Sequence, residues 1–189
     1  AHTLQPFDLQ LLHDQNGLGA AVAAGFQDGK VFHIGQGQQL GFNGARLHEK
    51  VFEPRYLYWA DKLGYICWGE YPDWGLNRTK VSSIENVLPE WIESVNRDMS
   101  HPSIIGWCPF NETWGYKEYD VNDRLIESVY KITKAIDSTR PCIAVSGNYH
   151  INGMEIYDVH DYCNSLSDFK EGYAHIKEGI VTDQVARRE

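Results

Sequence analysis

Residues 103–112 read SIIGWCPFNE, and this stretch decides the fold. It begins as an apolar run of strand length, which is typical of a strand buried on both faces of a parallel sheet. Asn111 and Glu112 come where that strand would end. Because a carboxylate beside an apolar strand is partly desolvated, its pKa is raised, and Glu112 is a candidate general acid. The same pattern also fits a glutamate that only begins a helix.

The composition indicates a folded chain whose partner is neither nucleic acid nor an anionic membrane. The 189 residues are 42% hydrophobic and 13% aromatic, enough for one domain with a core. The formal net charge is -9, and no lysine or arginine cluster offsets it, which argues against both partners. The aromatic residues indicate a Trp-rich core, platforms for ring-shaped ligands, or both.

Targeting signals and metal-binding motifs are not recognisable. No apolar run reaches membrane length, and the start of the chain lacks the pattern of a signal peptide. We therefore expect a cytoplasmic protein, although an exported protein whose signal had been removed would have the same sequence. The cysteines have no CxxC or CxxH spacing, so we expect reduced thiols and no cofactor. They are Cys67, Cys108, Cys142 and Cys163.

The chain divides near residue 40. Residues 1–40 hold seven of the eight glutamines and no tryptophan or tyrosine. We expect a weak helix at residues 20–24 and a short strand at residues 30–34, and we assign no chemistry to this part. Residues 41–189 are predicted to form the functional domain.

From Gly41 onward, short apolar segments alternate with amphipathic ones. The predicted strands are residues 41–48, 65–70, 103–112, 142–146 and 155–162. The predicted helices are residues 54–63, 84–98, 123–136 and 167–178. This alternation is typical of a parallel α/β sheet.

Polar residues recur at the carboxyl end of each predicted strand. They are Arg46 and His48, Glu70, Asn111 and Glu112, Asn148 and His150, and His160 and Asp161. In a (β/α) barrel these ends share one opening, where such enzymes carry out their chemistry. In a doubly wound sheet they would spread along an edge. No GxGxxG follows the first strand, and five polar-tipped strands favour the TIM-barrel type.

Most of the chain, from about Gly41 to about Glu178, resembles glycoside hydrolase family two, the group of β-galactosidases and β-glucuronidases. The similar segments are GFNGARLH at 41–48, WADKLGYI at 59–66, RDMSHPSIIGW at 97–107, and Asn111-Glu112. By this resemblance the chain holds about strands 2 to 6 of an incomplete TIM barrel.

The resemblance implies a retaining glycoside hydrolase that acts on β-linked sugars, most like a β-galactosidase. Glu112 would be the acid/base, and Asn111 would bind the sugar 2-hydroxyl. The family's nucleophile, a glutamate on the seventh strand, is not found in this chain. The other residues expected to contact the carbohydrate substrate are Arg46, His48, Glu70, Trp114, Asn148 and His160, with His150, Trp68 and Trp74 as further candidates. For Arg46 the structural alternative is a buried ion pair with Glu70 or Glu112.

Two other functions stay open. A partial barrel has unpaired edges, which either the rest of a longer enzyme or a second copy of the chain would cover. Alone, such a fragment would bind sugar weakly without turnover. A metal-dependent hydrolase is the second alternative, with a divalent ion bound by His48, His150, His160, Asp161 and Glu112. Because no HxH pair stands on the first strand, we predict no metal.

Overall fold

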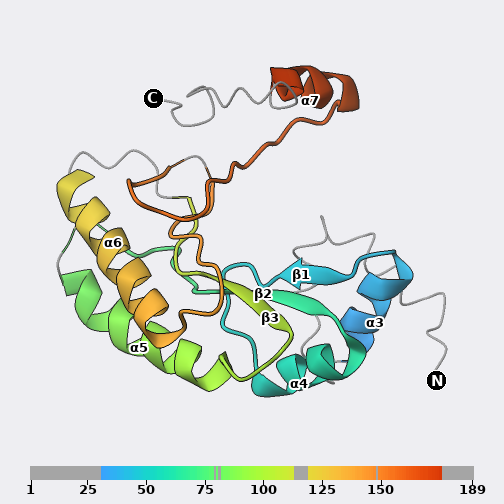
Figure 1. Ribbon diagram of the computed structural model, residues 1–189, viewed down its shortest axis with the longest axis horizontal. Coiled ribbons are helices and arrows are strands. Elements are labelled where there is room, and N and C mark those ends of the chain that lie inside the picture. The colour runs from blue at the N-terminus through green and yellow to red at the C-terminus, as the bar shows by residue number, and fades with distance from the viewer. Residues whose placement is uncertain (1–30, 79, 81, 113–118, 148, 176–189) are drawn as a thin grey trace.

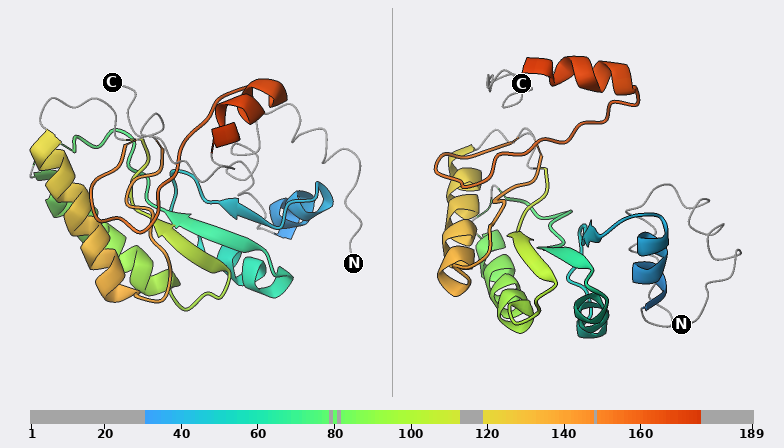
Figure 2. Two further views of the ribbon diagram at one scale, coloured as in Figure 1. Left: turned by 45° about the horizontal axis from the view of Figure 1, so that its top comes forward. Right: turned by 45° about the vertical axis from the view of Figure 1, so that its right-hand side comes forward.

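The computed structural model describes residues 31–78, 80, 82–112, 119–147 and 149–175, which form part of a parallel β-sheet with helices (Figure 1). In chain order the elements are α3 (Val31–Gln39), β1 (Gly44–Arg46), α4 (Pro54–Leu63), β2 (Ile66–Glu70), α5 (Ser82–Asp98), β3 (Ile104–Cys108), α6 (Tyr119–Ile136) and α7 (Leu166–Gly172). The strands are parallel and lie in the order β1-β2-β3. Helices α4, α5 and α6 lie on one side of this sheet, and α7 stands apart from it (Figure 2). This is the arrangement expected of an incomplete (β/α) barrel.

The helices follow the signals in the sequence. α4 begins with Pro54, whose missing N–H group is not needed in the first turn, and it stops at Gly64, which has a left-handed φ of 66°. The helices predicted at 84–98 and 123–136 correspond to α5 and α6, each of which begins slightly earlier. The prediction at 167–178 corresponds to α7, which is shorter.

The register between β2 and β3 shifts within the sheet. Cys67 pairs with Ile104, whereas Trp68 pairs with Gly106, so Ile105 is an extra residue in β3. A bulge of this kind bends the strand and changes which side chains face each side of the sheet after it.

After this bulge, Trp107 faces the helices and forms the centre of the core. Its ring lies edge-on to Trp91 of α5, with 5.8 Å between the ring centroids. The Nε1–H of Trp91 donates to Thr133 Oγ1 of α6 at 2.7 Å. The prediction of a Trp-rich core is thus confirmed for these two residues.

The fourth predicted strand, residues 142–146, lies beside β3 but is not a continuous ladder. It forms two isolated parallel bridges, one between Trp107 and Cys142 and one between Asn111 and Ser146. The segment therefore extends the sheet in the predicted place and direction, with regular pairing at these two bridges.

The prediction of a fifth strand at residues 155–162 is wrong. This segment forms no β-ladder in the structure. A strand needs a neighbouring backbone that takes its hydrogen bonds, and an apolar pattern cannot supply one. Side chains hold the segment instead; for example, the Gly147 N–H donates to Asp158 Oδ2 at 3.2 Å.

The prediction of a strand at residues 30–34 is also wrong, because Val31–Gln39 forms the helix α3. The glutamines after Ile34 have a good helix propensity, and they favour a helix that continues past the segment predicted as a strand. Ile34 itself is buried in the core. The helix predicted at residues 20–24 lies outside the described residues.

Within the described residues, helices cover one face of the sheet, whereas the sequence predicted that the strand at residues 103–112 is buried on both faces. Ile66 and Ile105 are each 39% exposed, although their neighbours Cys67 and Ile104 are buried. Among the described helices, none is both long and apolar enough to cross a membrane.

Asp137, just after α6, joins this helix to β3. Its carboxylate accepts hydrogen bonds from Trp107 Nε1 at 2.9 Å, Thr139 Oγ1 at 2.6 Å and Arg140 Nη1 at 2.8 Å. Burial alone would raise the pKa of Asp137, but these hydrogen bonds outweigh burial and hold the pKa well below its usual range. The stabilisation from Asp137 is therefore complete above the ordinary aspartate pKa and is lost as the pH falls toward the folded-state pKa.

We expect Asp137→Asn to lower the free energy of unfolding at pH 7 by about 2 kcal/mol, because the substitution replaces a charged hydrogen-bond acceptor with a neutral, weaker one. Urea denaturation at pH 7 and pH 3 measures this, and the deficit should be smaller at pH 3. The control is Asp168→Asn, at an exposed position of α7. Equal effects of the two substitutions at pH 7 would contradict the assignment.

Candidate active site

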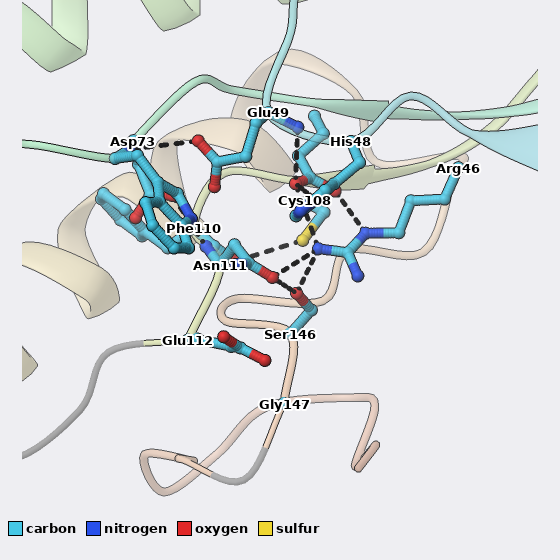
Figure 3. Close-up of polar contacts among 12 residues, drawn as sticks. Arg46, His48, Glu49, Asp73, Cys108, Phe110, Asn111, Glu112, Ser146 and Gly147 are labelled. Atoms are coloured by element: carbon cyan, nitrogen blue, oxygen red, sulfur yellow. Dashed lines mark hydrogen bonds and ion pairs between the residues drawn. The ribbon is translucent and has the colours of Figure 1, made fainter. Parts of the chain in front are cut away.

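The strand ends bring four of the predicted residues to one edge of the sheet. Arg46 ends β1, Glu70 ends β2, and Asn111 and Glu112 follow β3. Figure 3 shows the Arg46 guanidinium directed at the side chains of Asn111 and Ser146. The expectation that the ends of these parallel strands converge is confirmed for this group.

Arg46 is the centre of the polar network. Its Nε and Nη2 donate to the two carboxylate oxygens of Glu70, the second at 3.0 Å. Nη2 also donates to Asn111 Oδ1 at 2.6 Å and to Ser146 Oγ at 2.7 Å. Burial would lower the pKa of Arg46, but the ion pair with Glu70 outweighs burial and raises the pKa. The ion pair between Arg46 and Glu70, considered as the structural alternative, is therefore present. The same guanidinium also reaches Asn111 through a hydrogen bond.

Glu70 is buried, and both of its carboxylate oxygens are engaged within the protein. Besides Arg46, His48 Nδ1 lies 2.8 Å from Oε1, and the backbone N–H of Glu49 donates to Oε1 at 3.0 Å. With these partners, Glu70 orients Arg46 and His48. The expected contact of Glu70 with the carbohydrate substrate stays a prediction.

The amide of Asn111 has a defined orientation. Its Oδ1 accepts hydrogen bonds from Arg46 and, at 2.9 Å, from Ser146 Oγ. Because the oxygen is turned to two donors, the amide NH₂ is the group that points away from the guanidinium. Asn111 is thus arranged to donate a hydrogen bond to a ligand hydroxyl.

Glu112 is held in a strained conformation at the end of the strand. Its φ of 45° is left-handed, which is uncommon for a residue other than glycine. Its Oε1 accepts a hydrogen bond from the Tyr162 hydroxyl at 2.6 Å and contacts His160 Nδ1. The side chain is 14% exposed. Strain of this kind persists only where the surroundings impose it, and it is frequent at functional sites.

His160 connects Glu112 to Arg46. Its Nε2 lies 3.2 Å from Arg46 Nη1, which can only donate, so Nε2 accepts and the imidazole proton is on Nδ1. That proton points at Glu112 Oε1. Two groups therefore meet on Oε1 of Glu112, the His160 imidazole and the Tyr162 hydroxyl. His160, expected to contact substrate, is here a partner of the candidate acid/base.

Two residues of this network were not among the predicted site residues. Ser146 links Arg46 to Asn111, and Tyr162 donates to Glu112. The hydrogen bond to Glu112 raises the pKa of the Tyr162 hydroxyl. Both lie near the ends of predicted strands, so the strand-end rule could have found them.

The other predicted residues are further from this network or outside the described residues. Trp114 and Asn148 lie outside the part of the chain that the structure describes. The His150 ring stacks on Tyr157, with centroids 4.1 Å apart, and its Nε2 is 2.7 Å from the Asp158 carbonyl oxygen. Trp74 is 73% exposed, and its backbone N–H donates to the Glu49 carboxylate at 3.1 Å. Trp68 packs across Gly106 of β3, where an added Cβ would lie 2.6 Å from its ring.

A metal centre formed by the five residues considered in the sequence is not assembled. His48 instead groups with Glu49 and Glu70, whose possible ligand atoms all lie within 4.8 Å of one another. Because the Arg46 guanidinium already binds Glu70, a second cation there would be opposed by its charge.

A pocket of about 350 Å³ lies beside the Arg46 network, lined by strand residues that include the half-exposed Ile66 and Ile105. Its walls combine apolar side chains of the strands with polar groups of the network. The lining residues include Ile66, Trp68, Ile105, Arg46, Ser146 and Asp158. Burial raises the pKa of Asp158. The volume is in the range of small-ligand sites.

Comparison with known proteins gives a family match and related enzymes. The sequence model for the TIM barrel domain of glycosyl hydrolases family 2 matches residues 38–187. The β-glucuronidase of Chlorocebus aethiops is 28% identical in an alignment 144 residues long that covers 73% of this chain and 22% of that enzyme. The chain thus spans about a fifth of the length of this curated relative.

Solved structures have the same fold. The β-D-glucuronidase of Dictyoglomus thermophilum is 27% identical, with a TM-score of 0.54 over 61% of this chain and 22% of that chain. The β-glucuronidase of Parabacteroides merdae has a TM-score of 0.64 over 78% of this chain and 20% of that chain. At 17% identity, the second likeness supports the fold alone.

We expect Arg46→Ala to lower the free energy of unfolding by about 2–3 kcal/mol, because the buried Glu70 carboxylate loses its cation. Adding Glu70→Gln to this variant should recover part of the loss, since the uncompensated charge is removed. Urea denaturation measures both effects. Arg55→Ala, at an exposed position of α4, is the control and should change stability by less than about 0.5 kcal/mol. An Arg46→Ala loss as small as that of the control would refute the central role of this pair.

Proposed function

This chain belongs to the glycosyl hydrolases of family 2, within their TIM barrel domain, and we propose that it carries the acid/base part of a retaining β-glycosidase site. The observation that supports this best is the setting of Glu112. Its carboxylate is oriented by His160 and Tyr162, beside an Asn111 amide turned to donate.

In the proposed mechanism, Glu112 protonates the glycosidic oxygen and then removes a proton from the incoming water. Tyr162 and His160 both contact Oε1 of Glu112 and orient the carboxylate for this proton transfer. The Asn111 NH₂ would bind the sugar 2-hydroxyl, a contact that strengthens in the oxocarbenium-like transition state.

The nucleophile is not assigned. A retaining enzyme places it about 5–5.5 Å from the acid/base carboxylate. Glu70, the other carboxylate of this network, is bound on both oxygens by the protein and does not fit that role. The proposal therefore gives Glu112 the acid/base role alone.

For the substrate, we favour β-glucuronides over the β-galactosides expected from the sequence. The support is the names of the similar enzymes, which are β-glucuronidases. On 4-nitrophenyl glycosides, the protein expressed from its complete gene should hydrolyse the β-glucuronide at least tenfold faster than the β-galactoside or β-mannoside. A faster β-galactoside would reverse the assignment. Binding of sugar without turnover of any glycoside would support the alternative of a non-catalytic domain.

We expect Glu112→Gln to lower kcat by about 10²–10⁴-fold with the fold intact, because proton transfer in both steps is lost. The loss should be smaller for a dinitrophenyl glycoside, whose leaving group needs no proton, and azide should restore part of the rate because it needs no base. Steady-state kinetics and circular dichroism measure these outcomes.

The matched control is Glu127→Gln on α6, where the carboxylate pairs with Lys131 at the surface. It should leave kcat unchanged. An unaltered rate for Glu112→Gln would refute the acid/base assignment.

A further inference from the structure

We propose that Asp73 and Arg78 form a clamp that holds the Asn111 backbone and thereby positions Glu112. Both residues lie in the loop between β2 and α5, and neither was among the predicted site residues. The effect on catalysis rests on the proposed function, whereas the contacts of Asp73 and Arg78 with the Asn111 backbone do not depend on it.

The clamp grips both polar groups of the Asn111 backbone. The Asn111 N–H donates to Asp73 Oδ1 at 3.1 Å, and Arg78 Nη2 donates to the Asn111 carbonyl oxygen at 2.9 Å. Arg78 Nη2 also forms an ion pair with Asp73 Oδ2. Asp73 is 1% exposed and Arg78 is 4% exposed. In addition, the Arg78 guanidinium lies over the Phe110 ring, 5.8 Å from its centroid.

The backbone N–H and carbonyl of Asn111 that face Asp73 and Arg78 have no partner in the neighbouring strand β2. On the side of residues 142–146, the neighbouring backbone is paired: the Ser146 N–H donates to the Phe110 carbonyl, and the Glu112 N–H donates to the Ser146 carbonyl, both at 2.9 Å. On the other side, β2 ends at Glu70, whose partner in β3 is Cys108. A buried backbone group without a partner is costly, so Asp73 and Arg78 take the place that a longer β2 would have.

Together these contacts fix the plane of the peptide between Asn111 and Glu112. Its carbonyl oxygen is held by Arg78, and its N–H is held by the Ser146 carbonyl. Rotation of this peptide would change the φ of Glu112, which is 45°, and would move its carboxylate away from His160 and Tyr162. The clamp therefore maintains the strained conformation on which the aim of Glu112 depends.

Asp73 and Arg78 are positioning residues, because the contacts that carry this argument are to the backbone of Asn111. The kinetic test is Arg78→Lys in the protein expressed from its complete gene, assayed on 4-nitrophenyl β-glucuronide. Lysine keeps the charge, but its side chain is shorter, so its ammonium does not reach the position from which Arg78 Nη2 contacts both Asp73 and the Asn111 carbonyl oxygen. We expect kcat to fall about 10- to 100-fold, as for a small misplacement of a catalytic group, with KM changed less than threefold.

Arg140→Lys is the matched control. Arg140 also pairs with a buried aspartate, Asp137, and also donates to backbone carbonyls, those of Ile104 and His101, but these precede or begin β3. It should lower the melting temperature to a similar extent while kcat stays within twofold. Equal kcat losses in the two variants, or an unchanged kcat in Arg78→Lys, would overturn the positioning role.

A second measurement does not depend on turnover. In Asp73→Ala, amide hydrogen exchange at Asn111 should be at least tenfold faster than in the unmodified protein, because its acceptor is removed. Exchange at Ile143, which donates to the Trp107 carbonyl, should not change. Unchanged exchange at Asn111 in the folded variant would overturn the clamp. If the unmodified protein hydrolyses no glycoside, the proposed function fails, and this exchange measurement alone decides the clamp.

Discussion

The ion pair between Arg46 and Glu70 is the interaction on which the rest of the site depends. Glu70 is buried at the end of β2, where a carboxylate is tolerated only with a cation and hydrogen-bond donors. Arg46 supplies the cation from the neighbouring strand, and its remaining donors then reach Asn111, Ser146 and His160. The need of the buried Glu70 carboxylate for a cation thus joins the ends of successive strands through Arg46, and it sets the orientation of the groups around Glu112.

Much of the architecture could be predicted, because local signals and tertiary packing agree there. Pro54 and Gly64 delimit α4, and the apolar runs before Glu70 and Asn111 became β2 and β3. The family resemblance and the incomplete barrel were also correct. The strand at residues 155–162 failed, since an apolar pattern does not reveal whether a backbone partner is present. The bulge at Ile105 was not predicted, although Gly106 beside it is a signal, because an isolated glycine within a strand often marks a bulge.

The candidate site was predictable where it follows from topology. Arg46, Glu70 and Asn111 meet because parallel strands end at the same edge. Ser146 and Tyr162 end the strands predicted at residues 142–146 and 155–162, so the strand-end rule covered their positions, but their hydroxyl groups were not counted among the candidate polar groups. The Asp73–Arg78 pair was missed because it acts through a backbone that only coordinates reveal. The prediction of β-galactosidase specificity lacked support in the sequence. Asn111 and Glu112 serve the reaction common to the family and do not distinguish one sugar from another.

The extra residue in β3 has a consequence for how this protein can vary. Side chains along a strand alternate, so the count of residues before a position decides its environment as firmly as its identity does. A strand that lacked Ile105 would keep the pairs Trp68–Gly106 and Gly69–Trp107 as a regular ladder, so the Trp107 indole would still face the helices. A deletion at this point would remove only the bulge, whereas a deletion elsewhere in β3 would move the side chains that follow it to the opposite face of the sheet. Changes of chain length in this strand should therefore be best tolerated at the bulge.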